Sequence, residues 1–412
     1  MQMKKVVKWF CLVVLIVGLL VGCSQKKEEA VDLKNADWTE IEELARGTEV
    51  NIYMWGGSTA INKWMDTYVS ETMKERYNLK VNRVPMNASE FINKLLTEKE
   101  AGKEKGSIDV IWINGENFRT ARQADLLWGP FTHQIPNFRK YVDQNDPGIK
   151  YDFGYPVEGY EAPWGRAQMV LIYNSEKVPN PPRNFDELKE WVKANPGRFT
   201  YPALPDFTGS AFVRMALYHT TGGYEQYLSG FDQKLLDEKI GLLWDYLNEI
   251  EPYLWRQGKT YPQDLAQLDN LYAQGEVWMT MDYNPAKAAN MIAQGVFPES
   301  SRSLVFDTGT IANTHFLAIP FNAPNKAGAM VLINFLESPE AQISKFKPEN
   351  WGDMIALDVT KLPEKYQKQI ESIRQSEATL SLKTLKEHSV PEIPSAYIPV
   401  IEEGWEANVL KK

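Results

Sequence analysis

The chain has 412 residues and a formal net charge of −9; 43% of its residues are hydrophobic and 12% are aromatic. This length exceeds what one hydrophobic core usually covers, so we expect two domains with substantial cores. The acidic balance and the lack of a basic stripe in the sequence argue against nucleic acid as a partner.

The N-terminus has the features of a secretory signal. Three lysines within the first eight residues precede an almost wholly apolar run, residues 9–22, and Cys23 follows directly. A basic start, a short apolar core and a small-residue end are typical of a signal peptide. The run is too short to span a bilayer comfortably. We therefore expect residues 1–22 to be a signal peptide that is removed on export.

The end of this run resembles the lipobox of bacterial lipoproteins. Residues 20–23 read LVGC, and in a lipobox the cysteine becomes the lipidated first residue of the mature chain. The resemblance implies that Cys23 carries acyl chains such as palmitate and anchors the protein to the outer face of the bacterial cell membrane. An ordinary signal with an incidental cysteine is the alternative. Cys11 would leave with the signal, and residues 23–46 are expected to form a polar tether.

The next part of the chain alternates between strand and helix patterns. Residues 49–55, 79–86 and 107–114 are rich in β-formers, and helical periodicity covers 61–73 and 89–102. This β-α-β-α-β order predicts an α/β domain with a largely parallel sheet. The carboxyl ends of parallel strands share one edge, so we expect any ligand site there.

Two later stretches predict that the chain passes between domains. Residues 162–191 contain a long apolar strand and a proline-rich turn before a helix that begins near Phe185. Residues 311–342 contain a strand, THFLAIPF, that stops at prolines and leads into another helix.

These stretches resemble the crossing segments of extracellular solute-binding proteins of ABC importers. The first contains LIYNSEKVPNPPRNFDELKEW and the second FLAIPFNAPNKAGAMVLINFLESPEAQ; NIYMWGG and the lipobox fit the same family. Within the family, YMWGGSTAINKW and LPDFTGSAFVR are most similar to the YnjB-like branch, which is grouped with thiamine, polyamine and iron binders. The resemblance covers roughly residues 47–345.

The resemblance implies an α/β fold of the two-lobed periplasmic-binding-protein type (type II), with a ligand cleft between lobes that crossing strands join. Lobe one is expected at 47–165 plus 317–360, and lobe two at 166–316 plus 361–412. Closure of the lobes around a small solute would present a surface to the permease subunits of the importer. The implied protein is a monomeric receptor without a cofactor or an enzymatic activity.

The first candidate site is the turn after residues 49–55. It consists of Trp55, Gly56, Gly57 and Ser58. Its glycines let a ligand approach the backbone, and the free N–H groups of the following helix start favour an anion or a polar oxygen. Trp55 could form a stacking wall. The alternative is a tight turn without a ligand role.

A second candidate site opens the apolar helix that stops near residue 222. Thr208, Gly209 and Ser210 precede this helix, and Arg214 lies one turn inside it. Hydroxyl and N–H groups at a helix start, completed by an arginine, predict an anion subsite. The alternative is a plain helix cap with a surface arginine.

Two further strand ends carry carboxylates and an aromatic ring. Asn114, Glu116 and Asn117 follow the third strand, while Asp282 and Tyr283 end another apolar run. A carboxylate beside an aromatic ring is a common way to hold an organic cation. Glu116 is equally consistent with a solvated loop acid.

The crossing strands supply the last candidates. Trp164 and Arg166 lie at the first crossing strand, and Asn313 and His315 flank the second. We expect His315 to be a hydrogen-bonded hinge residue rather than a metal ligand.

The sequence gives no positive support for an enzyme. It contains no phosphate loop, HExxH, paired CxxC or GxSxG motif, and its four histidines show no metal-ligand spacing. Two other classes stay open: a surface-anchored hydrolase, which would need a nucleophile with a base in reach, and a surface adhesion or sensory protein on the same scaffold, which would favour a large exposed apolar patch.

The ligand of a receptor stays open as well. Aromatic rings with acids favour an organic cation such as thiamine, and the two helix starts favour an anionic group, so a phosphorylated form would use both. A carbohydrate is the alternative. Ferric iron is disfavoured because no adjacent tyrosine pair is present.

Overall fold

A computed structural model describes residues 32–373 and 376–411. The chain divides into Met1–Ala36 and a body, Asp37–Lys412, that holds every described helix and strand. The expected signal peptide and Cys23 lie outside the described residues. No helix in the described ranges is both long and apolar enough to cross a membrane.

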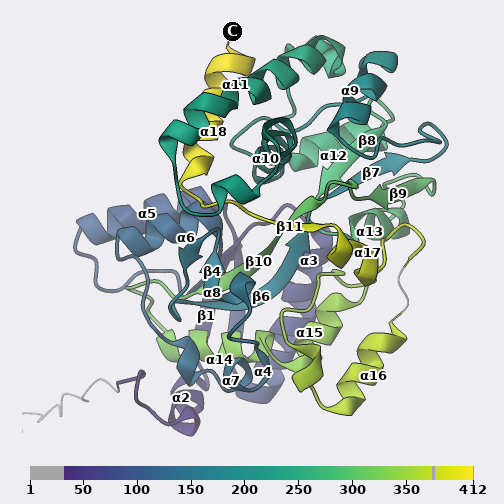
Figure 1. Cartoon of the computed structure of the whole chain (residues 1–412). Coiled ribbons are helices and arrows are strands. Elements are labelled where there is room, and N and C mark those ends of the chain that lie inside the picture. Colours follow the sequence, from purple (N-terminus) through teal and green to yellow (C-terminus); the bar gives the residue numbers. More distant parts are fainter. Residues whose placement is uncertain (1–31, 374–375, 412) are drawn as a thin grey trace, which may run out of the picture. The chain divides into compact units, whose positions relative to one another are not determined.

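The body contains one large mixed sheet, around which we define lobe one (Figure 1). Its strands are β1 (Glu49–Met54), β2 (Lys80–Pro85), β3 (Val110–Ile113), β6 (Glu161–Gln168), β10 (Thr310–Ala318) and β11 (Ser389–Pro391). They follow the order β11-β10-β3-β1-β2, and β6 also pairs with β10. β1 runs parallel to β2 and β3, as predicted, whereas β10 runs antiparallel to both β3 and β6. The sheet is mixed rather than largely parallel because a strand that returns from the other lobe enters it in the opposite direction.

Helices cover this sheet and form the far end of lobe one. They are α2 (Trp38–Ala45), α3 (Thr59–Trp64), α4 (Ser70–Tyr77), α5 (Ala88–Glu100), α6 (Gly115–Gln123), α7 (Pro136–Tyr141), α8 (Pro147–Lys150), α14 (Lys326–Leu336), α15 (Pro339–Phe346) and α16 (Glu364–Ser372). The helix predicted at 61–73 is a single run in which a π-helical turn, η1 (Met65–Val69), joins α3 to α4. The small hairpin β4 (Tyr151–Asp152) and β5 (Tyr155–Pro156) lies beside α6.

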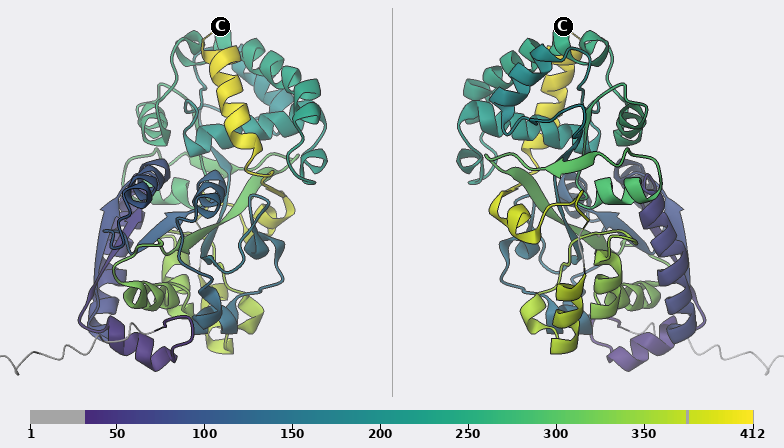
Figure 2. Two further views of the ribbon diagram at one scale, coloured as in Figure 1. Left: turned by 90° about the vertical axis from the view of Figure 1, so that its left-hand side faces the viewer. Right: turned by 90° about the vertical axis from the view of Figure 1, so that its right-hand side faces the viewer.

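Lobe two is built around a second sheet, ordered β8-β7-β9. Its strands are β7 (Val170–Asn174), β8 (Met279–Asp282) and β9 (Ser301–Leu304), and both pairings are antiparallel. Its helices are α9 (Phe185–Ala194), α10 (Phe207–Thr221), α11 (Gln233–Ile250), α12 (Leu265–Ala273), α13 (Lys287–Ala293), α17 (Leu382–Glu387) and α18 (Tyr397–Trp405). Figure 2 shows α18, drawn in yellow, among the teal helices of this lobe.

The remaining helical turns are short. They are the 3-10 segments η2 (Thr132–Gln134), η3 (Glu225–Tyr227), η4 (Glu251–Tyr253), η5 (Trp255–Gly258) and η6 (Val359–Lys361) and the π turn η7 (Glu406–Leu410). None of them lies in the large sheet or in the sheet of lobe two.

The chain leaves the large sheet after β6 and returns to it with β10. Only Met169 separates β6 from β7, and β9 is followed closely by β10. The expected helix start near Phe185 is confirmed by α9. The tail returns to lobe two after α16, which itself packs against α15 of lobe one, so the expected lobe boundary at 360 falls before this helix.

Helix α10 is the centre of the lobe-two core. Nearly all of its residues are buried, which agrees with its nearly continuous apolar sequence. Asp206 caps its start, and Gly222 ends it in the left-handed region with φ +91°. Thr208, Gly209 and Ser210 therefore form its first turn and do not precede it.

The expected tether at residues 23–46 ends earlier than predicted. Helix α2 occupies its last part, and Ile41 and Ala45 are completely buried. The helix packs against α14 of lobe one. Ile41 and Ala45 are four residues apart and so lie on one face of the helix. The surrounding residues are mostly polar, so the signal for an amphipathic helix in this part of the sequence is weak.

Replacing Ile41 with alanine should lower the free energy of unfolding by about 2–5 kcal/mol, since it removes a fully buried side chain from a packed core. Leu44 lies on the same helix and is 43% exposed, so Leu44→Ala should change the free energy of unfolding by less than about 0.5 kcal/mol. Urea unfolding of the two variants measures both effects. Equal stability of Ile41→Ala and the parent would show that α2 does not belong to the core.

Candidate functional site

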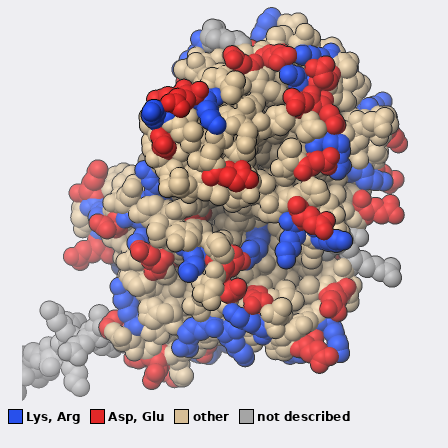
Figure 3. All heavy atoms as spheres, viewed as in Figure 1, with Lys and Arg blue, Asp and Glu red and all other residues tan. Residues whose placement is uncertain are grey.

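The face drawn in Figure 3 is hollowed between its upper and lower parts, where lobe two and lobe one approach each other. Three sets of sequence-predicted residues lie on elements that meet there: the turn after β1, the turn after β3 and the start of α10. The crossing strands β6 and β10 form the back of this region.

The turn after β1 reaches the other lobe. The Thr59 hydroxyl, at the start of α3, donates a hydrogen bond of 3.0 Å to Gln294 Oε1 at the end of α13. Ser58 caps the helix by accepting from the Ile61 N–H at 3.4 Å. A Cβ on Gly57 would overlap the indole ring of Trp55, so this ring lies against the glycine backbone. The turn thus lies at the edge of the hollow, with Trp55 partly exposed.

The turn after β3 is fixed by a hydrogen bond to an aspartate. Gly115, with φ +64°, donates its N–H to Asp152 Oδ2 at 2.6 Å. The positive φ favours glycine here, and the glycine lies against the ring of Phe153. Asn117 donates to Glu116 Oε1 at 2.8 Å. Asn114, Glu116 and Asn117 are all partly exposed, as a ligand contact requires.

Burial raises the pKa of Glu116 to about 7. The negative charges of Glu402 and Glu392 contribute to this rise in pKa, while the positive charge of Arg214 opposes it. Glu402 and Glu392 come from the tail, so this carboxyl group of lobe one faces charges of lobe two. A carboxyl group in such a position is uncompensated near neutral pH.

The start of α10 differs from the prediction. Asp206 Oδ1 accepts from the N–H groups of Thr208 and Gly209 at 2.9 and 3.0 Å. Thr208 and Ser210 are buried, and a Cβ on Gly209 would overlap the carbonyl of Pro202. The groups expected to bind an anion are therefore already occupied within lobe two.

Arg214 is a buried ion-pair partner and not a surface arginine. Its Nε and Nη2 donate to the two carboxylate oxygens of Glu392 at 2.9 and 3.0 Å, and its Nη1 donates to Ser210 Oγ at 2.7 Å. Tyr283 donates its hydroxyl to Glu392 Oε1 at 2.7 Å, and the amide of Asn313 lies 3.4 Å from the same oxygen. The predicted residues Arg214, Tyr283 and Asn313 thus meet on a glutamate that the prediction missed.

The hydrogen-bond and ion-pair partners of Asp282 both lie within lobe two. Its Oδ1 accepts from the Asn284 N–H at 2.7 Å, and its Oδ2 lies 3.3 Å from Lys287 Nζ. Lys287 also pairs with Asp269 at 2.6 Å. Burial lowers the pKa of Lys287, but the two aspartates outweigh this effect and raise it. Asp282 therefore fixes the turn before α13 and is 8% exposed.

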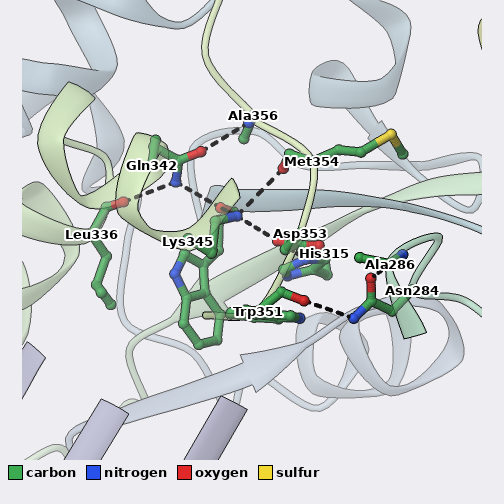
Figure 4. A network of polar contacts seen from close by, with 11 residues as sticks. Asn284, Ala286, His315, Leu336, Gln342, Lys345, Trp351, Asp353, Met354 and Ala356 are labelled. Carbon is green, nitrogen blue, oxygen red and sulfur yellow. Dashed lines mark hydrogen bonds and ion pairs between the residues drawn. The ribbon is translucent and has the colours of Figure 1, made fainter. Parts of the chain in front are cut away.

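Two predicted residues of the crossing strands, Trp164 and His315, meet in a tryptophan cluster, which we define as Trp112, Trp164 and Trp351. Their ring centroids lie 5.1–5.7 Å apart, and His315 lies 5.1–5.7 Å from all three. Figure 4 shows His315 directed at Asp353, which its Nε2 contacts at 2.9 Å and which also pairs with Lys345. His315 is a buried, hydrogen-bonded residue of β10; its role at a hinge stays a prediction.

Arg166 lies apart from this cluster. Its guanidinium pairs with Asp146, and its backbone N–H donates to the Met354 carbonyl at 3.1 Å. It is partly exposed, so it keeps a place at the edge of the hollow.

We define an acidic cluster as Glu116, Asp152, Glu161, Glu392 and Glu402. Glu392 pairs with Arg214, and Glu116 and Glu402 also feel its charge. Asp152 lies near Glu116 and Glu392, and Glu161 lies near Asp152 and Arg122. Burial raises the pKa of Asp152, and the negative charges of Glu116 and Glu392 add to this. Burial also raises the pKa of Glu161, where the charge of Asp152 adds to the effect and that of Arg122 opposes it. Among the described residues, Asp152 Oδ1 and both carboxylate oxygens of Glu161 have no hydrogen-bond partner. In the same part of the chain, no three His, Cys, Asp or Glu residues are arranged to hold a metal ion.

Four members of the acidic cluster escaped the sequence analysis. Glu392 and Glu402 lie in the tail, far from any strand-end motif, and Asp152 lies in a two-residue strand. Glu161 stands at the start of β6, where a lone acid before an apolar run was the available signal.

The two-lobed arrangement is that of the periplasmic solute-binding proteins. The family model for bacterial extracellular solute-binding proteins matches residues 67–372. The chain is also 42% identical over 340 residues to the protein YnjB of Escherichia coli strain K12, covering 82% of this chain and 87% of YnjB. The chain therefore belongs to the bacterial extracellular solute-binding family, which places its work outside the cytoplasm.

Solved structures share the fold. The periplasmic binding protein AfuA of Actinobacillus pleuropneumoniae, with fructose-6-phosphate bound, has a TM-score of 0.62 at 14% identity, covering 89% of this chain and 99% of AfuA. A putative spermidine/putrescine ABC transporter of Listeria monocytogenes has a TM-score of 0.60 at 15% identity, covering 87% and 98%. These identities are low, so the two structures support the two-lobed fold alone.

Replacing Arg214 with methionine should lower the free energy of unfolding by about 3–5 kcal/mol, because it leaves Glu392 buried without its counter-charge. The double variant Arg214→Met with Glu392→Met should lose less, since neither charge then remains unpaired. Urea unfolding of both variants and of Glu392→Met gives the coupling energy. A stable Arg214→Met variant that has lost only solute binding would instead support the anion subsite.

Proposed function

We propose that this chain is the lipid-anchored receptor of an ABC importer, which captures an organic cation between its lobes and delivers it to permease subunits. The family supports capture of a solute outside the cytoplasm. The similarity of the fold to an ABC transporter protein supports the importer. The anchor would be Cys23, through the lipobox that precedes the tether.

The acidic cluster carries the choice of a cation. Arg214 is paired with Glu392, and the other four carboxyl groups of the cluster form no ion pair among the described residues, although Arg122 lies near Glu161. Buried carboxylates without a counter-charge are costly unless they are protonated or neutralised by a cation. A positively charged solute beside Glu116 would supply the missing charge at the place where the two lobes meet.

The aromatic rings near Glu116 suit the same solute. Phe207 at the start of α10 lies 6.2 Å from Phe153 and 5.0 Å from Tyr283, measured between ring centroids. This row joins the hairpin of lobe one to the turn of lobe two. Aromatic faces attract organic cations such as a thiamine-like compound.

A phosphorylated solute is less well supported than a plain cation. The N–H groups at the start of α10 are held by Asp206, and Arg214 is held by Glu392. The other helix start, at Ser58, is the remaining place for an anionic group. A carbohydrate stays the second candidate, because the aromatic row and the amides of Asn114 and Asn117 would also suit sugar hydroxyls.

Native mass spectrometry of residues 24–412, purified without denaturation, should show an added small mass that disappears on denaturation. The value of that mass separates a thiamine-like or polyamine cation from a sugar. Recovery of a neutral sugar would contradict the cation. A bare protein that no thiamine, polyamine or sugar shifts in a thermal screen would favour the adhesion or sensory alternative.

Replacing Glu116 with glutamine should stabilise the empty protein at pH 8 and leave it nearly unchanged at pH 5. The folded pKa is about 7, above the usual 4.5, so the parent loses stability as the pH rises through this window. The affinity of the parent for a cation should rise over the same window, because binding favours the ionised carboxylate. Calorimetric melts and titrations at both pH values measure this.

The control for this experiment is Glu403→Gln, an exposed glutamate next to Glu402 on α18. It should leave both the melting temperature and the solute affinity of the parent unchanged. A Glu116→Gln variant with the parent's affinity at pH 8 would remove Glu116 from the site.

A further inference from the structure

The loop between α15 and η6 is held by both lobes of the body. It carries Trp351, a member of the tryptophan cluster, and Asp353, the partner of His315 (Figure 4). Trp351 also lies 6.0 Å from Trp64 of α3, measured between ring centroids. Both side chains of the loop are therefore packed into lobe one.

The base of this loop is fixed on the crossing strands. Lys345 Nζ pairs with Asp353 and donates to the Trp164 carbonyl at 2.6 Å. A Cβ on Gly165 of β6 would overlap Asp353, His315 and Lys345 at once, so this polar group lies directly on the strand backbone. The loop can therefore move with lobe one but not separately from it.

The tip of the same loop is held by lobe two. Asn284 and Asn290 donate their side-chain amides to the Trp351 carbonyl at 3.0 and 2.7 Å. A Cβ on Gly352 would overlap Ala286, so the loop backbone touches the turn before α13. That turn and α13 are fixed within lobe two by the pairs of Lys287 with Asp269 and Asp282.

We propose that Asn290 and Asn284 are positioning residues that set solute affinity, because their amides hold the Trp351 carbonyl of lobe one only while the lobes are together. This inference rests on the proposed capture of a solute between the lobes. A solute that needs both lobes binds in proportion to the population in which they are together. Loss of one such hydrogen bond should lower the ratio of molecules with the lobes together to those with the lobes apart by about threefold to tenfold.

Asn290 is the cleaner position for a test. It is 7% exposed, and its Oδ1 has no hydrogen-bond partner among the described residues. Among the described residues, the side chain of Asn290 therefore makes one hydrogen bond, to the Trp351 carbonyl. Asn284, in contrast, also accepts from the Ala286 N–H at 2.9 Å and shapes the turn.

The experiment measures the separation of the lobes without a solute. The chain has no cysteine after residue 23, so Glu190→Cys on α9 and Lys368→Cys on α16 can be spin-labelled without background in residues 24–412. Both side chains are 70% exposed and lie in different lobes. Asn290→Ala should shift the distance distribution towards longer separations, and Asn290→Asp, which keeps the size but removes the donor, should do the same.

Asn195→Ala is the matched control, because the amide of Asn195 donates to the Trp191 carbonyl at 2.9 Å within lobe two alone. It should keep the parent's distribution. Parent-like distributions for both Asn290 variants would overturn the inference, whatever solute the receptor binds. A shifted distribution in a protein that binds no cation would leave the inference standing and contradict the proposed solute.

Discussion

The antiparallel pairing of β6 with β10 is the constraint on which the rest of the structure depends. It joins seven residue pairs, from Ala312 with Gln168 to Ala318 with Glu161. Both strands lead towards lobe two, so their hydrogen bonds fix a region through which the lobes are joined by continuous chain. Arg166, Asn313 and His315 owe their positions to this register, and so does the polar group that lies on Gly165. Any rearrangement of the lobes must therefore occur around this ribbon and not through it.

The two clusters between the lobes satisfy their polar groups in opposite ways. Lys345 and Asp353 form an ion pair whose charges cancel. Burial lowers the pKa of His315, which favours its neutral form, so the group of three carries little net charge. The acidic cluster, in contrast, holds five carboxyl groups, of which Glu392 alone forms an ion pair among the described residues, with Arg214. Structural sites usually compensate buried charge, whereas binding sites tolerate a local cost in exchange for function. The His315 group is therefore charge-compensated, and the acidic cluster is not.

Much of the scaffold could be predicted because its signals are local. Periodicity placed β1, β2, β3 and α5 to within a few residues, and the proline-rich turns marked both crossings. The partners within the site could not be predicted, since they depend on tertiary contacts between distant parts of the chain. Arg214 was predicted to complete an anion subsite, with a surface arginine as the alternative, but its guanidinium pairs with Glu392 of the tail. The α2 helix was missed for a related reason: two apolar residues in a polar stretch acquire meaning only when α14 lies opposite them.

The tail has a consequence for the order in which the body can form. Arg214 and its partner Glu392 are 178 residues apart in the chain. A chain that crosses a membrane with its N-terminus leading delivers α10 to the outer side long before it delivers Glu392. During that interval the guanidinium has no carboxylate, and burying it would be costly, so it must stay in contact with water. The core of lobe two therefore closes late, and the tail that completes the site also acts as the final step of assembly.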